Sequence, residues 1–259
     1  MTRYHVRHTT VYGYSQPVTL SHHLARLKPR NTPFQTVENS TVSMTPAPAY
    51  QTDSTDAFGN TATFLVVETP HAEMTVTSDF TATVKMPDYP AAANTPAWES
   101  VAAALALPST PETLDAAVFA HPSCFVPFSQ KAKAYAAPSF TPNRPILEAA
   151  EEIMRRIYAD FKYDSSATSI ATPIDETLEM KRGVCQDFAH VGIACLRAWG
   201  IAARYVSGYI RTRRAAEAEG VQLGLLSDYD LTGEAPSAAG TLVLGYGSLK
   251  DEACASVGE

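Results

Sequence analysis

The sequence predicts an α+β protein, in which an N-terminal antiparallel β-domain precedes a core that contains helices. Apolar and polar side chains alternate in the first 86 residues, which predicts strands. Further along, an apolar stripe from Ile146 to Phe161 recurs at helical spacing. A third observation is that Cys185 follows Gly183 and Val184 and stands at the start of another amphipathic helix. We therefore expect the core to be organised around the helix that begins at Cys185.

Composition and charge indicate an ordinary globular protein. The chain has 259 residues, of which 45% are hydrophobic, and a formal net charge of −7. Without a run of basic residues, neither nucleic acid nor an anionic membrane is an expected partner. Residues Met1–Gly13 lack the apolar segment of a secretory signal, so a cytoplasmic location is the default expectation. The composition gives no information on the oligomeric state.

The four cysteines do not indicate a metal site. Cys124, Cys185, Cys195 and Cys254 lack the paired short spacings of a zinc site and the density of a disulfide scaffold. This usage is typical of a reducing compartment. We expect no metal and no cofactor.

The region 1–86 is predicted to be a β-domain. The predicted strands are Tyr4–Tyr14, which Gln16-Pro17 would end, then Phe34–Thr45, Thr61–Glu68 and Met74–Val84. In the first strand the side chains at even positions from Tyr4 to Tyr14 are expected on one face, and Arg7 on the other. Asp56–Asn60 supplies turn residues. His22 and His23 precede basic residues that resemble a ligand site, but a strand edge or turn whose basic residues face solvent explains them better.

A proline-rich connection, 87–144, is predicted to follow, with short helices at Ala97–Leu105 and Leu114–Ala120. The core, 145–212, opens with the helix that carries the apolar stripe Ile146, Ala150, Ile153, Ile157 and Phe161. A shorter helix is predicted from an N-cap at Thr172 to about Lys181. Its end leads directly to Gly183 and Cys185.

The helix that begins at Cys185 has an apolar face made by Phe188, Val191, Cys195 and Trp199, and Gly200 ends it. A largely buried strand is predicted from Ile201 to Ile210. The first N–H groups of a helix lack internal partners and form the positive end of its dipole, so a thiol there ionises more easily. Cys185 is therefore a candidate nucleophile. The alternative is that Cys185 merely packs, as we expect for Cys195.

A catalytic thiolate also needs a base, which is most often a histidine. His190 is nearest in sequence, but five residues along a helix turn its side chain roughly 140° away from that of Cys185. We interpret His190 as structural.

Several segments carry a family resemblance: Phe161–Asp164, Thr168–Pro173, Gly183–His190 and Ala203–Tyr209 in the core, with Tyr4–His8, Pro17-Val18, Ser21-His22, Arg26–Arg30 and Asp56–Asn60 before it. Together they resemble the bacterial transglutaminase-like superfamily of thiol enzymes with a papain-like fold, preceded by its bacterial N-terminal region. The resemblance implies that Cys185 attacks a carboxamide or peptide carbonyl to form an acyl-enzyme, which water or an amine resolves. It implies a cysteine peptidase, an amidase or an acyl transferase acting on a peptide or protein carboxamide. Fold analogy does not choose the substrate.

The chain departs from the family pattern in its last part, residues 213–259. The family carries its histidine in a His-Ala-Trp strand and its aspartate after a Gly-Trp pair, whereas here no histidine follows His190 and no tryptophan follows Trp199. Asp228 and Asp230 lie in a turn-like run and are poor candidates for the carboxylate. The core is therefore predicted to be incomplete and its activity impaired.

Three explanations remain open for this departure. An active enzyme could recruit His71, His121 or His190, or a non-catalytic relative could use the domain for binding or assembly. Alternatively, a change of reading frame near Arg213, or truncation of the gene, could have replaced the last strands. A His-Ala-Trp segment in another frame downstream of Arg211 would support the third explanation. In the tail, 213–240 is predicted to be poorly ordered, and Thr241–Tyr246 is the one apolar run long enough to pair with the strand before it.

Overall fold

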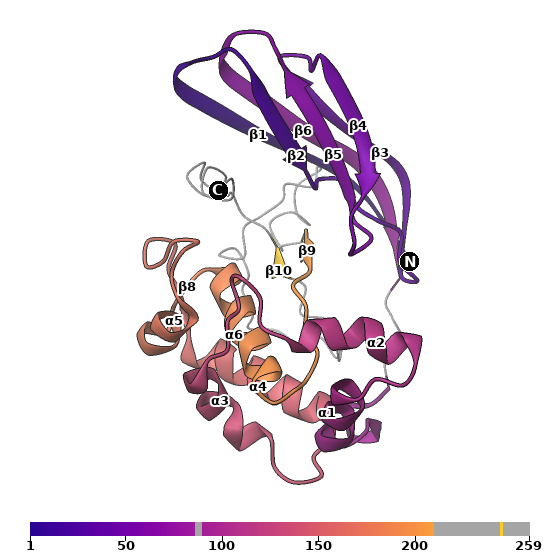
Figure 1. The fold of residues 1–259 in the computed structure, drawn as a ribbon, viewed down its shortest axis with the longest axis vertical. Coiled ribbons are helices and arrows are strands. Elements are labelled where there is room, and N and C mark those ends of the chain that lie inside the picture. The colour runs from indigo at the N-terminus through magenta and orange to yellow at the C-terminus, as the bar shows by residue number, and fades with distance from the viewer. Residues whose placement is uncertain (86–89, 210–243, 246–259) are drawn as a thin grey trace. The chain divides into compact units, whose positions relative to one another are not determined.

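The computed structural model describes residues 1–85, 90–209 and the backbone of 244–245 (Figure 1). The chain forms two compact units, which divide between Pro87 and Asp88. The first unit is built from strands, and all the α-helices of the described residues lie in the second.

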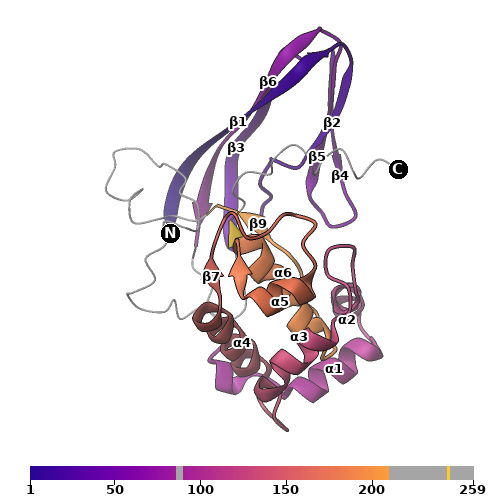
Figure 2. The same cartoon turned by 90° about the vertical axis from the view of Figure 1, so that its left-hand side faces the viewer.

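The N-terminal unit consists of two three-stranded antiparallel sheets, seen as separate layers in Figure 2. The strand order is β1-β6-β3 in one sheet and β2-β5-β4 in the other. The strands are β1 (Thr2–Val18), β2 (Ser21–Ala25), β3 (Gln35–Thr45), β4 (Tyr50–Thr55), β5 (Thr61–Val67) and β6 (His71–Val84). This confirms the predicted antiparallel β-region and adds two strands, β2 and β4. The six residues of β4 are all exposed and lack an apolar alternation.

The core of the N-terminal unit lies between these two sheets. Met44 of β3 and Val76 of β6 pack against Leu65 and Val67 of β5, which are both fully buried. Since side chains alternate along a strand, the opposite face of β1 is polar, and Arg7 lies within 2.6 Å of the Asp79 carboxylate there.

The predicted end of the first strand at Gln16-Pro17 is wrong. β1 continues to Val18, which pairs with His71 after a register shift that follows Gly13. Proline is tolerated at this position because β1 is an edge strand and the shift interrupts its ladder.

The predicted turn at Asp56–Asn60 joins β4 to β5. Gly59 has a φ of +77°, and its N–H donates to the carbonyl of Asp56 at 2.9 Å. The Asp56 carboxylate accepts from the backbone N–H groups of Asn60 and Phe58, each at 2.9 Å. Led by the bond from Asn60, these contacts lower the pKa of Asp56 to about 2. His22 and His23 lie on β2, at an edge of its sheet, so of the two expected alternatives, strand edge or turn, the structure has the strand edge.

The second unit contains six α-helices and short 3₁₀ turns among the described residues. The helices are α1 (Trp98–Ala106), α2 (Pro111–Ala117), α3 (Gln130–Ala136), α4 (Ile146–Asp160), α5 (Ile174–Met180) and α6 (Cys185–Arg197), and the 3₁₀ turns are η1 (Ala92–Asn94), η2 (Val118–Ala120) and η3 (Ala137–Ser139). The described residues of this unit also form four strands of two residues: β7 (Lys162–Tyr163), β8 (Arg182–Gly183), β9 (Ser207–Gly208) and β10 (Leu244–Gly245). Helix α3 was not predicted.

The core of the second unit forms where α4 and α6 pack together with α3 and α5. Its buried residues include Ile153 and Ile157 of α4 and Val191 and Cys195 of α6. Beside them, the rings of Trp98 and Trp199 meet edge to face at 5.3 Å, and Phe140 stacks on Trp199 at 4.8 Å.

Two local predictions in this unit are corrected. On α4 the fully buried alanine is Ala149 rather than Ala150, because Ala149 stands four residues before the buried Ile153 and shares its face of the helix. Thr172 is not the N-cap of α5, which is Pro173; the Thr172 hydroxyl instead accepts from the N–H of Ser169 at 2.9 Å.

The predicted buried strand at 201–210 is also wrong over most of its length. Only Ser207–Gly208 is β9, and in the described part of the segment only Ile201 is buried. The backbone of Ala203 makes other hydrogen bonds: its N–H donates to the carbonyl of Phe119 at 3.1 Å, and its own carbonyl accepts from Arg197. Because the N–H and the carbonyl of Ala203 are used in these bonds, they do not pair with a neighbouring strand.

The tail 213–243 and the residues after 245 lie outside the described residues, so the prediction of poor order there stays a prediction. From the apolar run Thr241–Tyr246, Leu244 and Gly245 pair in parallel with Ser207 and Gly208.

Candidate active site

The segment that enters α6 is held by a short parallel pairing of β7 with β8. Lys162 pairs with Arg182 and Tyr163 with Gly183. The N–H of Asp164 donates to the carbonyl of Gly183 at 2.8 Å. Just before β8, Lys181 ends α5 in the left-handed conformation, with a φ of +51°. The backbone is thus held from Lys181 to Gly183, which stands two residues before Cys185.

The first turn of α6 is closed by Asp187, which is 7% exposed. Its carboxylate accepts from the N–H of Val184 at 2.7 Å and from the hydroxyl of Thr168 at 2.6 Å. A carboxylate in this position satisfies an N–H group at the helix start and interacts favourably with the helix dipole. Thr168 comes from the loop after β7, so the bond also ties that loop to the helix start.

Gly183 is required by the close approach of Asp187. Its φ is +155°, and a Cβ placed on it would lie 2.5 Å from Oδ2 of Asp187. The glycine that the sequence places two residues before the cysteine therefore makes room for the carboxylate that closes the helix.

Cys185 is the first residue of α6, as predicted. It is 8% exposed and packs with Ala189 of the next turn and with the ring of Tyr205. The N–H groups in the first turn of an α-helix point out of the helix end, toward any group bound at the thiol. The position therefore combines a thiol, backbone donors and the positive end of a dipole.

His190 contacts two aromatic rings. Its imidazole stacks on Phe125 at 6.1 Å and lies tilted against Tyr205 at 5.5 Å. Burial is the main effect on the pKa of His190 and lowers it; Asp187 acts in the opposite direction and Arg197 lowers it further. These contacts agree with the structural role expected of His190.

The other two histidines considered as bases are His71 and His121. His71 belongs to the N-terminal unit, where its Nδ1 lies 2.7 Å from the carbonyl of Thr69. His121 is exposed in the turn after η2. Asp228 and Asp230 lie outside the described residues.

Cys195 behaves as predicted for a packing cysteine. It is fully buried in the core, and burial raises the pKa of its thiol to about 12. Cys124 is exposed, and neither it nor Cys185 or Cys195 forms a disulfide. Cys254 lies outside the described residues.

In the part of the chain that the structure describes, no three His, Cys, Asp or Glu side chains converge as metal ligands would. None of the helices in this part is both long and apolar enough to cross a membrane.

The position of Cys185 at the start of α6 was predicted from the sequence, but the residues that hold this position were not. Asp187 stands at the third position of α6, where a capping box carries an acidic residue, but Val184 at the N-cap lacks the usual hydroxyl. Thr168 and Tyr205 are distant in sequence, and no local pattern marks them as neighbours of the helix start.

Comparison with known proteins places both parts of the chain in one family. Residues 4–83 match the bacterial transglutaminase-like N-terminal region, and residues 133–233 match the transglutaminase-like superfamily core. Uncharacterized proteins of Mycobacterium tuberculosis and Mycobacterium bovis are each 40% identical over 213 residues, which cover 81% of this chain and 66% of theirs. The chain thus spans slightly less than two thirds of the length of these relatives.

A relative from Mycobacterium leprae, also uncharacterized, is 31% identical over 220 residues, covering 83% of this chain and 74% of its own length. The fold is similar to that of a candidate cysteine protease from Cytophaga hutchinsonii, with a TM-score of 0.62 and 18% identity over 82% of this chain and 69% of that one. Together the matches cover both units, and the chain belongs to the transglutaminase-like superfamily, with the bacterial transglutaminase-like N-terminal region at its start.

Proposed function

We propose that Cys185 is the nucleophile of a transglutaminase-like cysteine peptidase, amidase or acyl transferase. The observation that carries the proposal is the construction of the α6 start, where Gly183 and Asp187 hold the chain so that the thiol is the first residue of the helix. Such a position favours the thiolate, which is the reactive form of cysteine.

In the proposed reaction, the sulfur of Cys185 bonds to the carbonyl carbon of a carboxamide or peptide bond in a peptide or protein substrate. The oxyanion that forms is stabilised by backbone N–H groups of the first helical turn. The carbon–nitrogen bond then breaks, and the amine leaves with a proton. Water or a second amine attacks the thioester, which restores the thiol and releases the product.

We further propose that turnover by this chain is impaired. No histidine follows His190 in the sequence, and His190 itself stacks on Phe125 and lies tilted against Tyr205. When one member of a catalytic set that acts as a unit is missing, the rate falls by on the order of 10³-fold or more. The thiol would then react with strong electrophiles while hydrolysing amides slowly.

Alkylation rates test the nucleophile directly. Iodoacetamide at neutral pH, followed by peptide mapping, should label Cys185 faster than Cys124, although Cys124 is exposed and Cys185 is 8% exposed. Cys195, which is fully buried, gives the rate expected of a packed thiol. Labelling of Cys185 no faster than that of Cys195 would show that Cys185 only packs.

Turnover is tested separately with peptide and amide substrates, with and without an added amine acceptor. The Cys185→Ala variant is the blank, and Cys124→Ala is the matched control that should leave the rate unchanged. Fast labelling with no turnover above the blank supports an impaired enzyme.

The missing histidine also favours a second candidate function, in which the protein is a non-catalytic member of the family used for binding or assembly. This alternative predicts that Cys185 is neither preferentially labelled nor required for any turnover. Iodoacetamide labelling therefore separates the two functions, because only the first predicts preferential modification of Cys185.

A further inference from the structure

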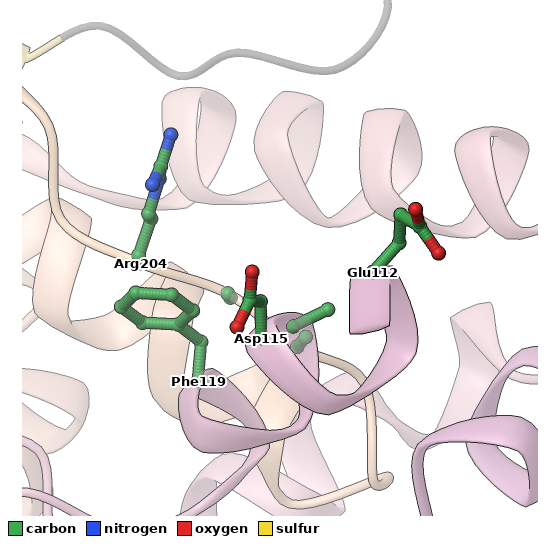
Figure 3. Close-up of a pocket in the computed structure, with 7 residues that line it drawn as sticks. Glu112, Asp115, Phe119 and Arg204 are labelled. Atoms are coloured by element: carbon green, nitrogen blue, oxygen red, sulfur yellow. The ribbon is translucent and has the colours of Figure 1, made fainter. Parts of the chain in front are cut away.

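A groove in the second unit is separate from the residues that contact Cys185. Its volume is about 350 Å³, and it lies between the helical segment α2–η2 and residues 202–204 (Figure 3). Glu112 and Asp115 line it from α2 and Arg204 lines it from the other side, while Phe119 and the small side chains of Ala202 and Ala203 make its apolar surface.

Charges of both signs face this groove. Glu112 and Asp115 are three positions apart on α2, so they lie on the same face of the helix. Figure 3 shows the Asp115 carboxylate between the Glu112 carboxylate and the Arg204 guanidinium. Among the described residues, none of the three is within 4.0 Å of an oppositely charged group.

The wall that carries Arg204 is held in place by backbone hydrogen bonds. The N–H of Ala203 donates to the carbonyl of Phe119 at 3.1 Å. The carbonyl of Ala203 accepts from Nε and Nη2 of Arg197 at 3.0 and 2.8 Å. The Arg204 guanidinium itself lies 5.5 Å from the centre of the Phe119 ring. The two sides of the groove therefore have a fixed spacing before any ligand arrives, which lowers the entropic cost of binding.

We propose that this groove binds a small zwitterion, an amino acid or a short peptide, with its ammonium group at Asp115 and Glu112 and its carboxylate at Arg204. Guanidinium groups bind carboxylates through paired hydrogen bonds, and the apolar surface would accept an aliphatic side chain. The volume is in the range of small-ligand sites. A simple anion would meet two carboxylates here, and an apolar ligand would remove three charges from water without replacing their hydrogen bonds.

Binding of a zwitterion at the groove does not depend on Cys185. Binding at the groove requires none of the residues proposed for acyl transfer, so either proposal can fail while the other stands. Binding measurements on the Cys185→Ala variant keep the two separate.

Four probes distinguish the charges that matter. Glycyl-leucine carries both charges, N-acetyl-glycyl-leucine lacks the ammonium, glycyl-leucinamide lacks the carboxylate, and free leucine shows whether an amino acid suffices. In a titration followed by ligand-observed NMR with the full chain, glycyl-leucine or leucine should bind, and each capped dipeptide should bind about tenfold more weakly than glycyl-leucine.

Variants assign each end of the ligand. Arg204→Gln should weaken glycyl-leucine about tenfold but should not weaken glycyl-leucinamide, which has no carboxylate for the guanidinium to bind. Asp115→Asn combined with Glu112→Gln should weaken glycyl-leucine but should not weaken the N-acetylated dipeptide, which has no ammonium and loses two like charges nearby. Arg155→Gln, at an exposed arginine of α4, is the matched control.

If circular dichroism shows that Arg204→Gln is poorly folded, Arg204→Lys replaces it as the test. This variant keeps the positive charge and should retain part of the affinity for glycyl-leucine. Failure of all four probes to bind the folded wild-type chain at millimolar concentration would overturn the proposal. Equal affinity for the capped and uncapped dipeptides would overturn it as well.

Discussion

At the residue scale, the position of Cys185 depends on Gly183 and Asp187. The carboxylate of Asp187 reaches back to the N–H of Val184, and it occupies the space where a side chain on Gly183 would begin. Burial of Asp187 makes this bond costly to lose, because an unsatisfied buried carboxylate is destabilising. The local geometry thus stabilises the fold and sets the direction of the thiol at the same time.

The Gly183→Ala variant should lose about 2 kcal/mol or more of unfolding free energy, because its Cβ would displace the Asp187 carboxylate. Urea unfolding followed by the helical circular dichroism signal measures this change. Gly13→Ala is the control, since a Cβ on Gly13 meets nothing within 4 Å. Equal stability of the two variants would show that the α6 start tolerates the displacement.

His190 should make the stability of the second unit depend on pH. Burial lowers its pKa below the ordinary value of 6.5, so the unfolded chain binds a proton that the folded chain resists. Stability should therefore fall as the pH drops below about 6.5. His190→Phe, which keeps the stacking on Phe125, should flatten this dependence in urea titrations at several pH values. An identical slope in His190→Phe would contradict the assignment, and the exposed His121, replaced by Phe, is the control position.

At the scale of elements, Arg197 joins three segments of the second unit. Its guanidinium donates to the carbonyl of Ala203 and, through Nη1, to the hydroxyl of Ser123 at 2.9 Å. The end of α6, the segment after Gly200 and the turn at Ser123–Val126 are thereby connected. Burial lowers the pKa of Arg197, but an arginine remains charged across the physiological range.

Replacing Arg197 with Met keeps much of the aliphatic packing but removes these hydrogen bonds. We expect a loss of about 1–3 kcal/mol in stability and faster hydrogen exchange at the Ala203 amide, whose bond to Phe119 the arginine supports. Hydrogen exchange resolved to single residues is the measurement. Arg155→Met, at an exposed ion pair, should change neither quantity.

Helices and strands with a strong apolar periodicity could be predicted from the sequence. Segments whose conformation depends on hydrogen bonds to residues far away in the sequence could not. The alternation in β1 and the stripe on α4 and α6 gave the right secondary structure, because burial follows from spacing in those segments. The segment 201–210 has the composition of a strand, but the backbone N–H and carbonyl of Ala203 bond to Phe119 and Arg197 instead of to a neighbouring strand. Similarly, Pro17 suggested a strand end, while an edge strand with a register shift accepts it.

The candidate site shows the same division. The position of Cys185 at the helix start was predictable because the apolar periodicity of the helix and the glycine before it are local. The bond from Thr168 to Asp187 and the contact of Tyr205 with Cys185 join residues about 20 positions apart, and spacing alone does not predict such pairs. The groove was not foreseen either, since α2 and Arg204 are brought together only by the fold.

At the scale of the whole molecule, each unit has a hydrophobic core of its own. Leu65, which is fully buried, belongs to the core of the N-terminal unit, whereas Ile153, 2% exposed, belongs to that of the second. Units with separate cores generally unfold as separate cooperative structures.

Leu65→Ala should therefore accelerate amide hydrogen exchange in peptides from residues 1–85 and leave those from 90–209 unchanged. Ile153→Ala should do the reverse, and each substitution should cost its own unit about 2–5 kcal/mol. Mass spectrometry of digested peptides measures both in one experiment. Acceleration in both ranges by either variant would show that the two units unfold together.

The contact between Trp98 and Trp199 has an optical consequence. These are the only two tryptophans of the chain, and their rings meet at 5.3 Å with an angle of 88° between them. Each indole N–H donates to a backbone carbonyl, of Thr141 for Trp98 and of Lys133 for Trp199, so the environment of each ring is well defined. Intrinsic indole fluorescence therefore arises entirely from this one cluster, where excitation can pass between neighbouring rings. A red shift in tryptophan emission during unfolding would report when α1 separates from the end of α6. The β-sheets of the N-terminal unit contain no tryptophan and would not contribute to this signal.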